Sequence, residues 1–518
     1  MTSRSIDADD LYRKNLPQDV GMCTVLQPAE MLKGEILLHE AARKNDVEKV
    51  KELIARKVNI NARNNLDRTA LQWAAANGHS EAIEALLNAG ADIEAQDKYG
   101  MRALLWAAWF GHTEAMKLLV NSGAHVNCSN RQGLNMLHCA AQNNHKEAIE
   151  FIRDHIENYQ MNDVDKNEKT ALHLAAEKGH LETVETLLSA RCEVQRKDKT
   201  GQTAVHVAAA SGFTDILRKL LEAGVEVDDR DVEGRTAIHL AAEHGHAESV
   251  KILLEHDSDA NAETTKESTA LHLAAQNGHT DVIAALVEHG CNLNAQNHQG
   301  NTALHLAAIN NHPPIMKKLI DSSCELDLPN HRMQTPLHAA VENGFDDAVE
   351  ELLIAGADLK ATEKTGKMAL DMAVRSSYHN ICDAVIRAEW AQEVGNSNVE
   401  FKKTLHDGAE YMKDILWKLA HKQLRQGEWK KLAMHWQFND QHIKAIEHQY
   451  TGPNSYKEHG YRLLLIWLHG IKRTDNAMKL LFEALVVINR KELAEQIRRK
   501  ANLQADKNNS GKYSCLIS

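Results

Sequence analysis

The sequence of 518 residues is poor in several features, and each shortage excludes a class of protein. The two longest apolar runs, 463–468 and 484–488, are far shorter than the ~20 residues that cross a bilayer. The eight cysteines form no Cys-x-x-Cys pair, and so long a chain needs no disulfide framework, so we expect reduced thiols. Basic residues are in deficit as well: 60 Lys and Arg against 72 Asp and Glu give a net charge of −12, which argues against a nucleic-acid partner.

Targeting signals are equally scarce at the N-terminus. The segment 1–33 contains no apolar signal core, and Thr2 stands where myristoylation needs glycine. We therefore expect a cytoplasmic protein that joins a membrane only through an added lipid. The last four residues, Cys515-Leu516-Ile517-Ser518, fit the C-a-a-X pattern for farnesylation, so Cys515 is a candidate prenylation site on a flexible polar tail, 506–518; the alternative is an unmodified tail.

Histidine, by contrast, is abundant, at 30 residues, because a short phrase recurs along the chain. The phrase Thr-Ala-Leu-His-Leu-Ala-Ala occurs at 170–176 and 302–308, with close variants at 69–75 and 236–242. Its Thr position serves as a marker that returns at one constant interval, apart from a single longer step between Asn135 and Thr170, and it defines eleven units. The marker residues are Ile36, Thr69, Arg102, Asn135, Thr170, Thr203, Thr236, Thr269, Thr302, Thr335 and Met368.

A 33-residue period that carries this phrase resembles the ankyrin-repeat family, from residue 33 to residue 388. The resemblance implies an all-α solenoid in which each unit adds two short helices and buries its apolar face on its neighbours. It also implies that the histidine three positions after the marker bonds the Thr hydroxyl and nearby backbone, tying one unit to the next. No convergent metal-ligand motif such as His-Glu-x-x-His occurs, so we expect no metal and no cofactor.

A different pattern follows the repeats. We assign 1–32 to an N-terminal segment and 389–404 to a linker. From 405 to 505, apolar residues spaced three and four apart predict six short helices: 411–425, 429–435, 440–448, 455–469, 474–488 and 490–501. The order of Trp429, Ile443, Leu463, Trp467 and Leu485 resembles a death domain. The predicted fold is therefore an all-α ankyrin solenoid followed by a six-helix death-domain bundle.

This second module is basic, with 17 Lys and Arg against 11 Asp and Glu between 405 and 505. Death domains associate with each other through complementary charged faces, so the resemblance makes Lys430, Lys431, Arg498 and Arg499 candidates for such a face. The alternative is an ordinary solvated helix surface. Trp429 and Trp467 are expected in the core.

No catalytic motif stands out: the chain has no Gly-x-x-x-x-Gly-Lys loop and no Gly-x-Ser-x-Gly elbow, so we expect no enzyme activity. Partners of ankyrin-like arrays contact the turn tips and the ends of the first helices. In the third unit these places hold Tyr99, Met101, Trp109 and Phe110, which we interpret as an aromatic anchor for a protein ligand. Packing of Trp109 and Phe110 on a neighbouring unit is the alternative.

Four asparagines lie in unit-ending turns, eight positions after a leucine. This spacing resembles the pattern that asparaginyl hydroxylases use on ankyrin repeats, which would make such an enzyme a partner; the alternative is that Asn simply suits the turn. The four residues are Asn61, Asn127, Asn261 and Asn294.

Together these patterns predict a non-enzymatic intracellular adaptor. The ankyrin array would bind one protein, and the death domain would pair with another death domain to transmit a signal of the apoptotic or inflammatory type. Two alternatives stay open: a negative regulator that caps a death-domain partner, and a scaffold tethered to a membrane through Cys515.

Overall fold

A computed structural model describes residues 32–393, 409–471 and 476–507. These residues fold into helices and connecting turns without any strand, as the sequence predicts. The chain divides into two compact halves, Met1–Asp259 and Ala260–Ser518. The second half contains both the last repeats and the C-terminal helical bundle.

Eleven helix pairs fill residues 33–393 of the described chain, which we call the repeat array. In every pair but the first, whose helix begins three residues before its marker Ile36, the first helix begins just after the marker residue, and the second follows after a short break. The pairs of the first half are α2 (Lys33–Lys44) with α3 (Val47–Ala55), α4 (Ala70–Ala76) with α5 (Ser80–Asn88), α6 (Ala103–Trp109) with α7 (Thr113–Asn121), α8 (Met136–Gln142) with α9 (Lys146–His155), α10 (Ala171–Lys178) with α11 (Leu181–Ser189), α12 (Ala204–Ser211) with α13 (Thr214–Glu222), and α14 (Ala237–His244) with α15 (Ala247–Glu255). Those of the second half are α16 (Ala270–Asn277) with α17 (Thr280–Glu288), α18 (Ala303–Ile309) with α19 (Pro313–Asp321), α20 (Pro336–Asn343) with α21 (Asp346–Ala355), and α22 (Ala369–Arg375) with α23 (His379–Glu393).

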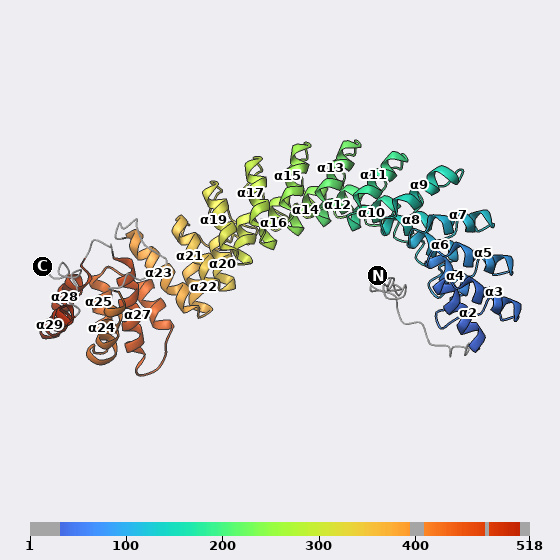
Figure 1. Ribbon diagram of the computed structural model, residues 1–518. Coiled ribbons are helices and arrows are strands. Elements are labelled where there is room, and N and C mark those ends of the chain that lie inside the picture. Colours follow the sequence, from blue (N-terminus) through green and yellow to red (C-terminus); the bar gives the residue numbers. More distant parts are fainter. Residues whose placement is uncertain (1–31, 394–408, 472–475, 508–518) are drawn as a thin grey trace. The chain divides into compact units, whose positions relative to one another are not determined.

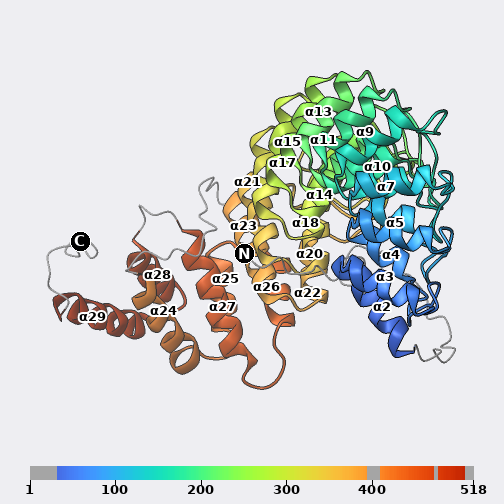
Figure 2. The same cartoon turned by 45° about the vertical axis from the view of Figure 1, so that its right-hand side comes forward.

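Within each half the first helices stack on one another in one row and the second helices form another row (Figures 1 and 2). The first helices are almost entirely buried, and their alanines, such as Ala175 and Ala176, let neighbouring helices approach closely. The second helices bury only one stripe, such as Val184 and Leu187 of α11. Every repeat unit therefore covers its core with the units on either side of it.

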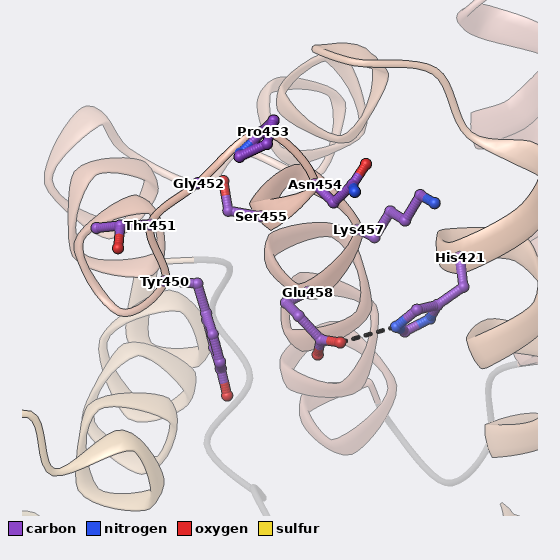
Figure 3. A pocket seen from close by; sticks show the side chains of 9 residues that line it. All are labelled: His421, Tyr450, Thr451, Gly452, Pro453, Asn454, Ser455, Lys457 and Glu458. Carbon is purple, nitrogen blue, oxygen red and sulfur yellow. Dashed lines mark hydrogen bonds and ion pairs between the residues drawn. The ribbon is translucent and has the colours of Figure 1, made fainter.

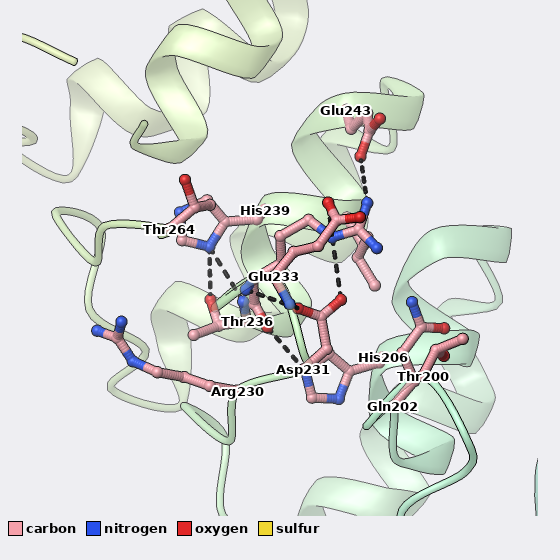
Figure 4. Close-up of polar contacts among 12 residues, drawn as sticks. Thr200, Gln202, His206, Arg230, Asp231, Glu233, Thr236, His239, Glu243 and Thr264 are labelled. Atoms are coloured by element: carbon pink, nitrogen blue, oxygen red, sulfur yellow. Dashed lines mark hydrogen bonds and ion pairs between the residues drawn. The ribbon is translucent and has the colours of Figure 1, made fainter. Parts of the chain in front are cut away.

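Two histidines in each typical unit join it to both neighbours. The first lies three residues after the marker and bonds forward: Nε2 of His173 donates to the carbonyl of Gln202, 3.0 Å away, while its Nδ1 lies 2.8 Å from the Thr170 hydroxyl. Figure 4 shows the same pairing of Thr236 with His239. The bonding that the resemblance implied is thus confirmed, and we call this repeated arrangement the histidine ladder.

The second histidine follows the break between the helices and bonds backward, a role that the sequence analysis did not predict. Nε2 of His112 lies 3.1 Å from the carbonyl of Ala76, in the preceding unit, and His180 reaches Gln142 in the same way at 3.0 Å. The glycine of the preceding break makes room for this ring. A Cβ on Gly78, whose φ is +71°, would lie only 2.6 Å from Nδ1 of His112.

The C-terminal bundle follows the predicted helices closely. Its elements are α24 (Ala409–Lys418), continued by a π-helical turn η1 (Leu419–Gln423), then α25 (Glu428–His435), α26 (Asp440–His448), α27 (Ser455–Gly470), α28 (Ala477–Val487) and α29 (Lys491–Lys507). Trp429 and Trp467 are buried, as predicted, and Trp467 stacks on Trp436 with ring centroids 4.4 Å apart.

The last helix of the repeat array is longer than the sequence analysis predicted. α23 continues to Glu393, beyond the expected boundary at 388, because Trp390 and Ala391 are buried and extend its apolar face. The rest of the predicted linker, 394–404, lies outside the described residues, as do residues 508–518 of the predicted tail, which include Cys515; residues 506 and 507 belong to the last helix, Lys491–Lys507.

The histidine ladder makes the array sensitive to acid. Burial lowers the pKa of His305 to about 4, helped by the neighbouring His272 and His338. A depressed pKa means that the folded array favours the neutral ring, so its stabilising effect is complete above pH ~6.5 and is lost as the pH falls towards 4. Stability should therefore decline over this acidic range.

We predict that His305→Gln flattens the decline. Gln72 already occupies the same slot in the second unit, where its amide accepts from the Thr69 N–H (2.9 Å) and donates to the Met101 carbonyl (2.8 Å) without a titrating group. Between pH 7 and pH 4.5 the variant should keep on the order of 2 kcal/mol that the wild type loses. Thermal unfolding at both pH values measures this, with the exposed His125→Gln as control; equal losses in all three proteins would contradict it.

Candidate interaction surfaces

The structure corrects the predicted aromatic anchor of the third unit. Met101 is 0% exposed and Trp109 is 3% exposed, so neither side chain can contact a ligand from its present position. Trp109 lies in α6, which packs between α4 and α8, and its carbonyl accepts the backward bond of His145 at 2.9 Å. For Trp109 the structure therefore favours the alternative, packing on the neighbouring units, and Met101 is buried as well.

A buried ion pair accounts for one aromatic residue of this region, Trp106. The side chain of Arg68 is 2% exposed, with its Nε 3.3 Å from Asp97 and its guanidinium 4.2 Å from the centroid of the Trp106 ring. The Trp106 indole N–H donates to the same carboxylate at 3.1 Å. Burial raises the pKa of Asp97, and its hydrogen bonds and Arg68 oppose that shift. Since a buried arginine needs such partners, Trp106 serves the core.

Tyr99 and Phe110 remain at the edge of this cluster and are half-buried. The Phe110 ring stacks on Trp106 at 5.9 Å, while Tyr99 lies at the turn tip, where its backbone carbonyl accepts from the Arg131 N–H at 3.0 Å. Of the four predicted anchor residues, only these two keep side-chain surface for a partner.

The four candidate asparagines occupy one slot of the repeat, and most of its occupants have a structural role. Oδ1 of Asn61 accepts from the backbone N–H of Asp92 in the next unit at 2.8 Å. Asn261 and Asn294 make the same bond, at 2.7 Å and 2.9 Å. Among the described contacts Asn127 makes no equivalent bond, because it precedes the unit with the longer marker step. An inter-unit hydrogen bond therefore gives three of the four asparagines a structural role.

The predicted basic face of the C-terminal bundle is divided. Lys430 and Lys431 lie in α25, whereas Arg498 and Arg499 lie in α29, and α28 packs against both helices. Lys430 forms an ion pair with Glu447 of α26 at 2.5 Å. Lys431 and the two arginines are exposed, and Arg498 lies 5.7 Å from the centroid of the Phe482 ring. Three exposed cations thus remain for a partner.

The opposite side of the bundle is occupied by the chain's own last repeat, a contact that sequence reasoning missed. Asp383 of α23 pairs with Arg462 of α27 at 2.7 Å, and Arg462 also donates to the Tyr450 hydroxyl at 3.0 Å. Glu389 lies 2.7 Å from Nε2 of the buried His442. Burial raises the pKa of Asp383 to about 6, although Arg462 and Arg387 draw it the other way.

Aromatic packing completes this contact, which we call the array–bundle interface. The Trp390 indole N–H donates to the Trp436 carbonyl at 2.6 Å, and its ring stacks on Phe438 with centroids 5.1 Å apart. α27 carries Gly470 at this place, where a Cβ would lie 2.5 Å from the Trp390 ring. Trp390, just past the expected end of the array, was the signal in the sequence that could have revealed the interface.

One open pocket of about 440 Å³ lies beside the start of α27 (Figure 3). Its lining includes the connection between α26 and α27 and His421 of η1, whose Nε2 is 2.9 Å from Glu458. This pair joins η1 to α27, so both side chains have a structural role. Within the described residues, no group of three or more His, Cys, Asp or Glu could hold a metal ion. Nor is any helix there long and apolar enough to cross a membrane.

The described residues form stacked helix pairs and a C-terminal six-helix bundle, an arrangement typical of proteins that bind other proteins. Family models agree. The model of ankyrin repeats (three copies) matches residues 38–130, 104–198, 189–264, 257–330 and 313–398, and the death-domain model matches 413–501. The chain therefore belongs to the ankyrin-repeat family and carries a C-terminal death domain. Both are non-catalytic interaction modules, which makes the protein a protein–protein interaction adaptor.

The inter-unit bond of the asparagine slot can be tested directly. Asn61→Ala removes the acceptor for the Asp92 N–H and should lower the free energy of unfolding by about 1 kcal/mol. Asn127→Ala, in the equivalent slot without this bond, is the matched control and should cost less than half as much. Urea denaturation of the full chain measures both; equal effects would contradict the structural role.

The array–bundle interface should depend on the Arg462–Asp383 pair. Arg462→Met leaves a largely buried carboxylate without its partner and should destabilise the second half of the chain by about 3 kcal/mol. The double variant Arg462→Met/Asp383→Leu removes both charges and should recover most of that loss. Lys430→Met, which breaks the more exposed pair with Glu447, should cost less than about 1 kcal/mol. Denaturant unfolding compares the three variants; a Lys430→Met cost equal to that of Arg462→Met would contradict the prediction.

Proposed function

We propose that the protein is a cytoplasmic signalling adaptor: its ankyrin array captures one protein, and its death domain pairs with another death domain to transmit an apoptotic or inflammatory-type signal. The observation that supports this most is the division of the death-domain surface. α23 covers the side made by α26 and α27, while the side made by α25, α28 and α29 carries the exposed Lys431, Arg498 and Arg499.

The array–bundle interface gives this proposal a physical route. The last repeat and the death domain share buried pairs, Asp383 with Arg462 and Glu389 with His442, so a ligand held on the last repeats is presented at a fixed place beside the death domain. Such fixed geometry raises the local concentration of a captured protein near a death-domain partner. No chemical step is needed.

The basic side also fits the alternative role of a negative regulator, in which the death domain caps a partner without extending an assembly. Self-association separates the two roles. We predict that the full chain forms concentration-dependent oligomers through these cations, and that Lys431→Glu/Arg499→Glu weakens them at least tenfold. Sedimentation velocity over a range of concentrations measures this.

Lys430→Gln is the control, because Lys430 is already engaged by Glu447 and should leave the oligomers unchanged. If the oligomers persist in the double variant, the exposed cations do not mediate self-association. A wild-type chain that stays monomeric at every concentration would favour capping.

Two modifications predicted from the sequence extend the proposal. Prenylation of Cys515, outside the described residues, would tether the adaptor to a membrane. Hydroxylation by an asparaginyl hydroxylase remains a proposal for Asn61, Asn127, Asn261 and Asn294, and Asn127 is the one whose presence the inter-unit bond does not explain.

A further inference from the structure

Four successive turn tips in the first half of the chain carry a basic residue at one equivalent place, four positions before the marker. All four side chains are exposed. We call them the tip row: Lys98, Arg131, Lys166 and Lys199. The next tip carries Val232, which is 68% exposed, so the charge ends there and an exposed apolar side chain takes its place.

The backbone holds these residues in register. Each donates its N–H to a carbonyl on the preceding tip: Lys98 to Leu66 at 2.9 Å, and Arg131 to Tyr99 at 3.0 Å. The bond recurs from Lys166 to Gln132 at 3.0 Å, from Lys199 to Asn167 at 2.9 Å and from Val232 to Thr200 at 3.0 Å. The tips therefore form one continuous hydrogen-bonded strip, and their side chains repeat at the spacing of stacked helices, about 8–10 Å.

The positive charges of the tip row are not paired with carboxylates within the described structure. None of its four side chains takes part in an ion pair among the described residues. The neighbouring carboxylates accept hydrogen bonds from the backbone of their own turns. Asp97 accepts from the N–H groups of Tyr99 and Met101. Asp198 accepts from those of Thr200 and Gln202. In a chain with a net charge of −12, such a row stands out as an exposed cationic feature.

We infer that the tip row binds an extended acidic segment of a partner protein, with carboxylates at every third residue and an apolar residue at the Val232 end. An extended chain rises about 3.3 Å per residue, so every third side chain recurs at about 10 Å, which matches the spacing of the tips. Complementary charge sets the register, and Val232 marks where the acidic stretch stops. This inference rests on the proposed capture of a protein by the array and names the chemistry of that partner.

The test uses the full-length protein and two fluorescent peptides of identical composition. One peptide spaces four glutamates by two serines each and ends with two serines and a leucine; its isomer places the four glutamates together. The spaced peptide should bind about tenfold more tightly, measured by fluorescence anisotropy, and its affinity should fall as salt is raised.

The variant Lys98→Gln/Arg131→Gln/Lys166→Gln/Lys199→Gln should weaken binding of the spaced peptide by about thirtyfold, as expected for four exposed charge pairs. The matched control, Lys51→Gln/Lys117→Gln/Arg153→Gln/Arg218→Gln, removes the same charge from second helices of the same half of the chain and should bind like the wild type. Val232→Ser should reduce the affinity for the spaced peptide, but not for a version of that peptide in which serine replaces the terminal leucine.

Equal affinity for both peptides would contradict the predicted spacing of the carboxylates. Equal losses of affinity in the two fourfold variants would contradict the tip row as the binding site. Tighter binding of a single-stranded RNA than of the spaced peptide would overturn the choice of a protein partner. A peptide library distinguishes failure of the inference from failure of the proposed function. If the captured peptides lack acidic residues and their binding depends on Phe110, the array is still a protein-binding module and only the acidic partner is ruled out. If no peptide is captured at all, the result counts against both the inference and the proposed function.

Discussion

The hydrogen bonding of buried histidines between neighbouring units is the interaction on which the rest of the structure depends. A single repeat unit has too little apolar surface for a core of its own, so it is stable only where it is tied to its neighbours. The forward bond of His173 to Gln202 and the backward bond of His180 to Gln142 satisfy partly buried backbone carbonyls on both sides of one unit. In the forward histidine Nδ1 also accepts from the Thr170 N–H while Nε2 donates, which requires a neutral ring with its proton on Nε2.

This ladder also positions the turn tips. Each forward bond ends on the carbonyl of the residue just before the next marker, at the base of a turn tip. The bonds therefore attach successive tips to the array at equivalent places. The tips then bond to each other through their own backbone, as Lys98 does to Leu66. A row of charges such as Lys98, Arg131, Lys166 and Lys199 has a regular spacing because the backbone beneath it is regular. Surface chemistry varies from unit to unit while the framework stays constant.

Much of the fold could be predicted from the sequence because repetition multiplies weak signals. The recurring phrase and its constant interval fix the helix pairs, and the apolar spacing around Leu463 and Trp467 places the bundle helices close to their observed bounds. The interaction sites were harder. The last residues of the first helices are at least partly exposed in most units, and by that rule Trp109 at the end of α6 should be exposed as well. Trp109 is instead 3% exposed, because α6 packs between α4 and α8. A pair such as Arg68 with Asp97, which joins two different units once, leaves no periodic trace.

The array–bundle interface was missed for the same reason, since it consists of contacts that occur only once. Trp390 lies beyond the last full repeat and Arg462 lies in a different module, so neither belongs to the repeated pattern. Sites that depart from the repeat are where an array acquires its individual function, because residues that only hold the stack together are shared by all units. By this reasoning the informative positions are those that interrupt a series: Val232 at the end of the tip row, Gln72 among the ladder histidines, and Trp390 where the array meets the death domain.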